Sequence, residues 1–231
     1  MRLDKMLAHL GYGSRKEVKQ FIRKGFISIN GEIIKDDDFH VDVDEDEIVF
    51  LDESVDYQDY QYILINKPQE TICSQDRGLY PSVLDLIQEA VLPDTQPVGR
   101  LDVDTTGTLL LTNDGQLAHR LISPKHHVEK VYLVQLKEVF NEKYIKAIES
   151  GLRLNDKEIC MSAKVKVIDD YQIELTLKEG KYHQVKRMML VCENEVVKLH
   201  RILFAGLRTD DLALGEYRSL SEKEIETLKR L

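Results

Sequence analysis

The chain has 231 residues, enough for one large domain or two smaller ones, and we expect two. It contains no apolar run of the roughly 20 residues that a bilayer-spanning helix needs, and its amino terminus does not resemble a secretory signal. Cys73, Cys160 and Cys192 are far apart and form no C-x-x-C pair, which argues against a disulfide framework or a zinc knuckle. These features favour a soluble, cytoplasmic protein with reduced thiols.

The net charge of -9 argues against nonspecific binding to nucleic acid, but the charge is unevenly distributed along the chain. Residues 1–27 contain seven basic and two acidic side chains. Residues 32–60 contain thirteen acidic side chains and one lysine. The sequence therefore predicts a basic head that is separated from the rest of the chain by an acidic segment.

The basic head has the pattern of two short helices followed by strands. Residues 3–10 carry apolar side chains at helical spacing, and Ser14 with Glu17 forms a capping box that predicts a second helix. Residues 26–29 and 47–51 are typical of strands, and a hairpin turn is expected after the first of them.

A domain boundary is expected in the acidic stretch that follows, because it has few apolar residues. We predict a small helix-helix-strand domain over residues 1–52, a linker over residues 53–60 and a second domain over residues 61–231.

The second domain is predicted to contain mostly strands with a few helices. Strands are expected at residues 62–65, 109–112, 131–136, 163–167, 173–177 and 196–204. Helices are expected at residues 82–90, 114–122, 141–150, 182–193 and 221–230. Because helices do not alternate regularly with these strands, we predict an α+β fold around a mixed or largely antiparallel sheet.

The segment from Gly99 to Gly107 places Asp102 between Arg100 and a threonine-glycine turn, next to strand-like sequence. A carboxylate is costly there if only packing is needed, which makes Asp102 a candidate for chemistry. Asp104 lies two residues further on. In an extended segment it would point the same way as Asp102, so a pair of carboxylates of the glycosidase type is possible.

Other chemistries fit this sequence less well. The same segment imitates a calcium loop, but Asn113 stands where that loop needs a glutamate. No phosphate-binding glycine motif occurs, and the histidines lack the spacing of metal ligands. We expect no metal site.

Residues 179–190 form a second candidate region. On a helix, His183, Lys186 and Arg187 would share one face, opposite an apolar face that packs into the core. A solvated charged face is the simpler interpretation. A cation near Asp102 would instead hold that carboxylate ionised and oriented.

Tyr132 lies in a strand-like segment and shares a face with Lys130 and Val134. A tyrosine in a strand is more often a packing residue than a catalytic one. If its face lines a cleft, the ring could stack on a base and the hydroxyl could relay a proton.

Four segments occur in the order found in ribosomal pseudouridine synthases of the small-subunit type, and the chain resembles that family over nearly its whole length. These segments are Lys67-Pro68, residues 99–107 with 111–115, residues 130–134 and residues 179–188. Residues 1–51 resemble the alpha-L RNA-binding module that this group carries in front.

The resemblance implies isomerisation of a uridine in ribosomal RNA to pseudouridine, without a metal or an organic cofactor. The catalytic residues that it implies are Asp102 as the carboxylate, Tyr132 stacking on the target base, and Lys186 pairing with the aspartate. Arg100 is expected to fill the gap that the flipped base leaves in the RNA stack. His183 and Arg187 are expected to contact RNA.

The basic head is expected to bind RNA through Arg2, Lys5, Arg15, Lys16, Arg23 and Lys24. The expected partner is ribosomal RNA or a ribosomal assembly intermediate, with no membrane partner, and the protein is expected to be a monomer. The sequence from His183 to Lys186 favours 16S over large-subunit RNA. A large-subunit enzyme, a noncatalytic RNA-binding assembly protein, and a hydrolase that uses Asp102 and Asp104 remain as alternatives.

Overall fold

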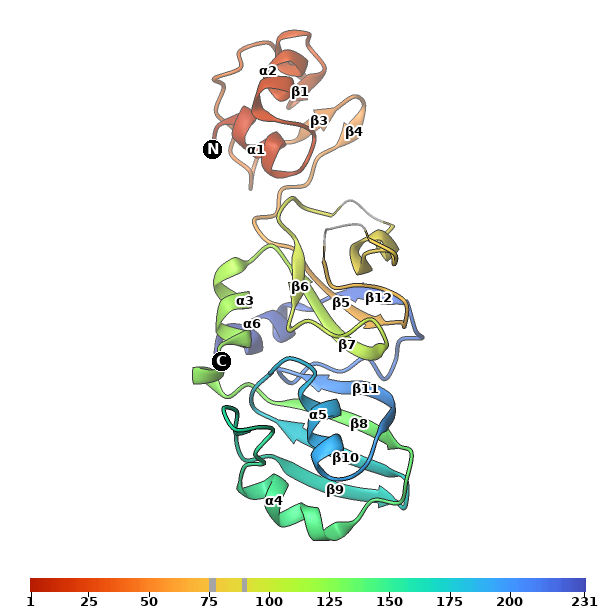
Figure 1. The fold of residues 1–231 in the computed structure, drawn as a ribbon. Coiled ribbons are helices and arrows are strands. Elements are labelled where there is room, and N and C mark those ends of the chain that lie inside the picture. The colour runs from red at the N-terminus through yellow and green to blue at the C-terminus, as the bar shows by residue number, and fades with distance from the viewer. Residues whose placement is uncertain (75–77, 89–90) are drawn as a thin grey trace. The chain divides into compact units, whose positions relative to one another are not determined.

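The computed structural model describes residues 1–74, 78–88 and 91–231 (Figure 1). Within these ranges the chain forms two compact units. The N-terminal unit comprises residues 1–61 and 91–95, and the C-terminal unit comprises residues 62–88 and 96–231. None of the helices in the described ranges is both long enough and apolar enough to span a membrane.

The N-terminal unit begins with helices α1 (Leu3–His9) and α2 (Arg15–Arg23). The predicted capping box starts α2, because the Ser14 hydroxyl accepts a hydrogen bond from the Glu17 backbone N–H and the Glu17 carboxylate accepts one from Ser14. An antiparallel sheet follows in the strand order β2-β1-β3-β4. Its strands are β1 (Ile27–Ile29), β2 (Glu32–Ile34), β3 (Ile48–Phe50) and β4 (Glu53–Ser54).

The core of this unit lies between the two helices and the sheet. Fully or nearly fully buried side chains from both helices and from β1 form it, namely Leu3, Met6, Leu7, Val18, Ile22, Ile27 and Ile29. Val55 is buried in the same core. The start of the predicted linker is therefore occupied by β4 and by a core residue of the N-terminal unit.

The C-terminal unit is built on one mixed sheet. Its strands in the described residues are β5 (Tyr62–Lys67), β6 (Gln96–Val98), β7 (Thr105–Thr112), β8 (Lys130–Leu136), β9 (Lys164–Asp169), β10 (Gln172–Leu177), β11 (Val196–Phe204) and β12 (Tyr217–Ser219). The strand order is β12-β5-β7-β11-β8-β10-β9, and β6 pairs with β7. The β7–β11 pair is parallel, and the other pairs are antiparallel. The predicted α+β fold with a mixed sheet is confirmed.

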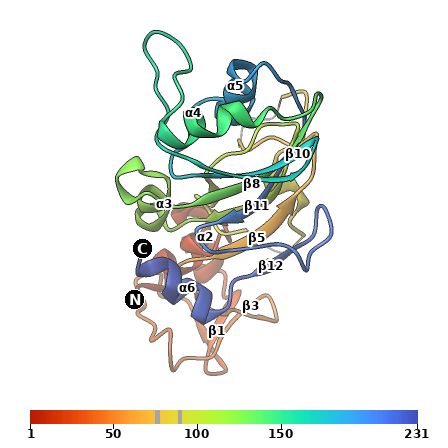
Figure 2. The same ribbon diagram turned by 90° about the horizontal axis from the view of Figure 1, so that it is seen from below.

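Helices cover this sheet. They are α3 (Gly115–Ile122), α4 (Ile145–Ser150), α5 (Gln184–Val191) and α6 (Glu222–Lys229), with short 3-10 turns at Val83–Leu86, Pro124–His126 and Glu142–Tyr144. Leu117 and Leu121 of α3 and Leu228 of α6 share a core cluster with β5 and β7, and α5 contacts β11. Figure 2 shows α3 and α6 on one side of the unit and α4 and α5 above β10.

Several predicted elements need correction. The helix predicted at residues 82–90 is a 3-10 turn at Val83–Leu86, because Ile87 has an extended backbone; its last two residues, 89 and 90, lie outside the described ranges. The helix predicted from residue 182 begins at Gln184, because His183 has a left-handed backbone with φ of 47°. The strand predicted at 109–112 begins already at Thr105.

Candidate active site

A cleft of about 1110 Å³ opens in the C-terminal unit. Its walls come from the loop between β6 and β7, from β8, and from the segment that precedes α5. The side chains that line it include Arg100, Asp102, Tyr132, His183 and Lys186. The structure thus brings together five of the predicted site residues, which come from three separate parts of the sequence.

Lys186 lies between two carboxylates. Its Nζ atom is 3.0 Å from Oδ2 of Asp102, and it is 2.6 and 2.9 Å from the two carboxylate oxygens of Asp104. Nε2 of His183 is 3.6 Å from Oδ1 of Asp102. Burial opposes the charge on Lys186, but its bonds to the two carboxylates outweigh this effect and raise the pKa of the ammonium. Lys186 therefore pairs with Asp102 as the resemblance implies.

Asp104 has a closer tie to the site than its place in a turn suggests. Its burial is outweighed by the hydrogen bond and ion pair with Lys186, which lower the pKa of its carboxyl group. A glycosidase-type pair needs one carboxyl group that keeps its proton, which calls for a raised pKa. Asp104 is therefore held as a carboxylate and is not suited to be the acid in the hydrolase alternative.

Arg187 points away from this cluster. Its guanidinium forms an ion pair with Glu158 and donates to the Tyr182 carbonyl oxygen at 3.2 Å. Sequence spacing places Arg187 with Lys186 on one helical face, but consecutive residues on a helix are turned by about 100° from each other. Only Lys186 faces Asp102, and contact between Arg187 and RNA stays a prediction.

Two buried cations fix the loop that carries Asp102. Nζ of Lys67 donates to the carbonyl oxygens of Pro68, Asp102 and Thr105 at 3.0, 3.1 and 3.0 Å. Arg201 donates from Nε to the Thr108 carbonyl at 2.8 Å and from Nη1 to the Gly99 carbonyl at 2.7 Å. Lys67 and Arg201 are 0% and 1% exposed. The hydrogen bonds of these two side chains hold both ends of the loop in place.

A glycine is required where β7 passes Arg201. Gly107 has φ of +110°, and a Cβ atom added to it would lie 2.3 Å from the Arg201 carbonyl oxygen. The glycine thus permits the close parallel pairing of β7 with β11. Arg201 was not predicted from the sequence. The available signal was a charged residue in phase with buried Leu199 in an otherwise strand-like run.

The turn before α5 is fixed by a buried glutamate. Glu179, 6% exposed, accepts hydrogen bonds from the Met161 backbone N–H and from Nε2 of Gln184, both at 2.8 Å. Oε1 of Gln184 accepts from the Lys181 backbone N–H at 2.8 Å. These bonds set the turn that brings His183 to the cleft and starts α5, so that Lys186 faces Asp102.

Tyr132 and Arg100 both line the cleft, but they differ in how exposed their side chains are. Tyr132, 9% exposed, lies on β8 with its neighbours in the sheet at Leu175 and Arg201. Arg100 is exposed at the cleft and has no hydrogen bond or ion pair to the rest of the described chain. A buried ring beside an exposed, unpaired guanidinium suits the roles predicted for them.

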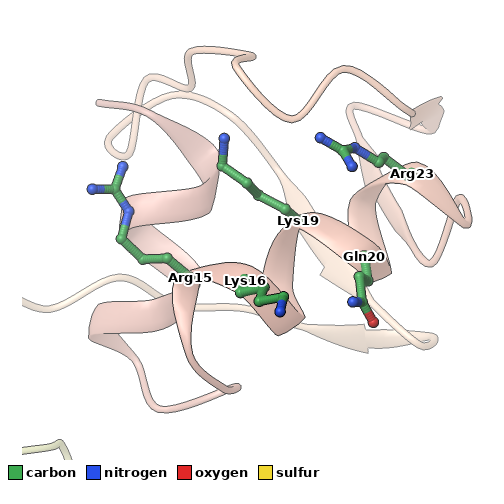
Figure 3. A pocket seen from close by; sticks show the side chains of 5 residues that line it. All are labelled: Arg15, Lys16, Lys19, Gln20 and Arg23. Atoms are coloured by element: carbon green, nitrogen blue, oxygen red, sulfur yellow. The ribbon is translucent and has the colours of Figure 1, made fainter.

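The basic residues of α2 gather on one face of that helix. Figure 3 shows Arg15, Lys16, Lys19, Gln20 and Arg23, which line a concave surface there. Lys5, Lys16 and Lys24 are exposed and form no ion pair within the described ranges.

Four basic residues of this unit, Arg2, Arg15, Lys19 and Arg23, have acidic partners. Asp4, fully buried, accepts from Arg2 at 3.0 Å and from Arg15 at 3.1 Å. Asp37 pairs with Lys19 at 3.1 Å and with Arg23 at 2.9 Å. The acidic segment that the sequence places after the basic head thus folds back onto it.

Comparisons with known proteins agree with this architecture. A family model described as RNA pseudouridylate synthase matches residues 61–190, and one described as S4 domain matches residues 1–48. The chain is 44% identical to ribosomal small subunit pseudouridine synthase A of Haemophilus influenzae, covering 99% of each chain. It is 40% identical to the protein of the same name from Escherichia coli, covering 99% of this chain and 100% of that one.

Two further matches extend over the whole chain. An uncharacterized RNA pseudouridine synthase of Bacillus subtilis is 45% identical, with 99% of this chain and 98% of that one covered. A solved structure described as a pseudouridylate synthase is 43% identical, with a TM-score of 0.70 and 99% of each chain covered. The chain therefore belongs to the RNA pseudouridylate synthase family, with an S4 domain at its N-terminal end.

Proposed function

We propose that this protein converts a specific uridine of 16S ribosomal RNA to pseudouridine, with Asp102 as the catalytic carboxylate. The observation that carries this proposal is the position of Asp102, bonded to Lys186 at 3.0 Å in a cleft whose wall contains Tyr132. Two of the most similar relatives are named for the small ribosomal subunit and match nearly end to end. The substrate is the RNA or an assembly intermediate, and the protein acts in the cytoplasm as a monomer.

The reaction is an isomerisation, so its atoms balance without a co-reactant. The bond between C1′ of the ribose and N1 of uracil breaks, and a bond between C1′ and C5 forms. C5 loses a proton and N1 gains one. Asp102 acts at the sugar or the base, and Tyr132 stacks on the ring and takes the C5 proton.

The target base must leave the RNA stack before it can reach Asp102. Arg100 is exposed at the cleft, and its planar guanidinium can stack where the base was. His183 and Arg187 lie on the adjoining segment. The N-terminal unit would hold the surrounding RNA through Arg2, Lys5, Arg15, Lys16, Arg23 and Lys24.

The test is pseudouridine formation on 16S and 23S transcripts and on the corresponding assembly particles. Asp102→Asn keeps the shape of the side chain and is expected to lower the rate by more than about 1000-fold, as loss of a central charged group does. Asp170→Asn, an exposed residue far from the cleft lining, is the control with the same change of charge.

Each alternative has its own signature in this experiment. Normal activity of Asp102→Asn would overturn the role of Asp102. Modification of 23S RNA alone would favour a large-subunit enzyme. RNA binding without modification would favour an assembly protein, and release of free uracil would favour a hydrolase.

A further inference from the structure

Lys130 is a buried lysine in the wall of the cleft, and the mechanism above gives it no role. It is 5% exposed, and its Nζ donates to the Val128 carbonyl oxygen at 3.0 Å. The ammonium also lies 5.7 Å from the centre of the Phe204 ring. No carboxylate in the described ranges lies within ion-pair distance of it. At least two of its three N–H donors thus lack a protein acceptor.

Packing alone does not account for a charge at this position. Burial lowers the pKa of Lys130 to about 8, and neighbouring Arg201 adds to this effect, while Glu179 opposes it. A methionine would fill a similar volume without the penalty of burying an ammonium. A methionine would lose the one hydrogen bond to the Val128 carbonyl, but it would remove the larger cost of burying an ammonium, so we expect it to give a more stable fold.

Lys130 is a neighbour of Tyr132 in the cleft wall. The two residues are two apart on β8, where burial alternates, so their side chains share a face with Cβ atoms about 7 Å apart. Both line the same cleft. A planar base stacked on the Tyr132 ring would therefore lie on the same wall of the cleft as the long Lys130 side chain, and the edge of uracil carries two carbonyl oxygens.

We propose that Lys130 donates a hydrogen bond to a carbonyl oxygen of the target uracil and stabilises the negative charge that this base carries during the reaction. The inference rests on the proposed function. When the C1′–N1 bond breaks, its electron pair stays with the base and is shared with the carbonyl oxygens. The base then supplies a pair from C5 to C1′. Lys130 keeps its proton throughout, so its contribution is electrostatic.

The neighbouring side chains favour a neutral planar ligand over a phosphate. The cleft is also lined by apolar side chains, including Ile72, Leu101 and Ile122. The positive charge next to Lys130 is largely engaged, since Nε and Nη1 of Arg201 donate to backbone carbonyl oxygens and Nη2 alone lacks a partner in the described residues. A phosphate would need several free donors, whereas a carbonyl oxygen needs one or two.

The pH dependence of the rate gives an independent readout. The groups that face Lys130 are Arg201 and Phe204 from β11, Glu179 from the turn before α5, and Tyr132 from its own strand. Because the protonated lysine is the active form, the rate is expected to fall above about pH 8. In Lys130→Arg the guanidinium stays charged, and this decline should move to higher pH.

The experiment compares wild type with Lys130→Met and Lys130→Arg. The control is Lys164→Met, which changes an exposed lysine on β9 in the same way. Three quantities are measured, namely single-turnover pseudouridine formation, the urea midpoint, and binding of free uracil and of inorganic phosphate by NMR. Lys130→Met is expected to lower the rate about 100-fold, to weaken uracil binding and to raise the urea midpoint. Lys164→Met is expected to match wild type in all three.

The combination of lower activity with higher stability separates a role in binding from a role in folding. A parallel loss of activity and stability in Lys130→Met would make it a structural residue and overturn the inference. So would wild-type activity, or a loss of phosphate binding with uracil binding intact. If wild type forms no pseudouridine, the proposed function fails, and uracil binding by the variants then decides the role of Lys130 separately.

Discussion

Basic side chains are used in opposite ways in the two units. On the N-terminal unit they lie at the surface of α2, and carboxylates such as Asp4 and Asp37 pair with several of them. In the C-terminal unit Lys67, Lys130 and Arg201 are buried and bind backbone carbonyl oxygens. The surface cations can exchange a carboxylate partner for a phosphate group of RNA. The buried cations instead hold the backbone of the active site in place.

Lys186 combines features of both kinds, and its removal has the largest expected effect. It is one-quarter exposed, yet it is bonded to both Asp102 and Asp104. Lys186→Met is expected to lower the rate of pseudouridine formation by about 1000-fold, because two neighbouring carboxylates then lose their shared cation. Single-turnover kinetics measures this effect.

Arg187→Met is the matched control, since Arg187 is the next residue of α5 but pairs with Glu158. Its rate of chemistry at saturating RNA is expected to stay within about threefold of wild type, within the range of a rim charge. Equal losses of rate in Lys186→Met and Arg187→Met would mean that the effect does not depend on the ion pair between Lys186 and Asp102.

The second prediction concerns stability. Arg201→Met leaves the buried carbonyl oxygens of Gly99 and Thr108 without a donor, at about 1–3 kcal/mol each. We expect the free energy of unfolding of the C-terminal unit to fall by about 2–5 kcal/mol. Arg15→Met removes a half-exposed cation from Asp4, and we expect it to lower the free energy of unfolding by no more than about 1 kcal/mol. Urea unfolding compares the two, and similar losses would erase the distinction between the units.

The smallest expected effect is on RNA affinity. Asp37→Asn releases Arg23 from its carboxylate partner and removes the nearest of the three carboxylates around Lys19. RNA binding is expected to strengthen about threefold at low salt, and the gain should shrink as salt rises. Asp52→Asn is the control, because Asp52 is exposed and pairs with no cation in the described ranges. Equal gains in both variants would show that only the net charge of the unit matters.

Local sequence patterns were sufficient to predict the helices whose first turns are stabilised by residues close in the sequence. The capping boxes at Ser14 and Ser221 start α2 and α6, because a hydroxyl and a carboxylate three residues apart satisfy each other's backbone donors. In the C-terminal unit two short strands, β6 and β12, were missed. Each has three residues and is held by its partner strand, and β6 contains a proline.

The candidate site depends on contacts between residues that are far apart in the sequence, and no local sequence pattern reveals such contacts. Asp102 and Lys186 are separated by 84 positions, and their pairing followed only from resemblance to a family. Arg201 was missed although it is in phase with buried Leu199, because the carbonyl oxygens that accept from its buried guanidinium lie 93 and 102 positions away. The charge count along the chain also gave no sign that Asp37 folds back onto α2.

The parallel pairing of β7 with β11 has a consequence for the order in which the enzyme matures. The Asp102 loop and its support Lys67 are synthesised long before Lys186 and Arg201, which come from the last quarter of the chain. Until α5 and β11 have been made, Asp102 lacks its cation and its loop lacks the support of Arg201. A nascent chain is therefore inactive until β11 has left the exit tunnel, so modification of RNA awaits the release of a nearly complete protein.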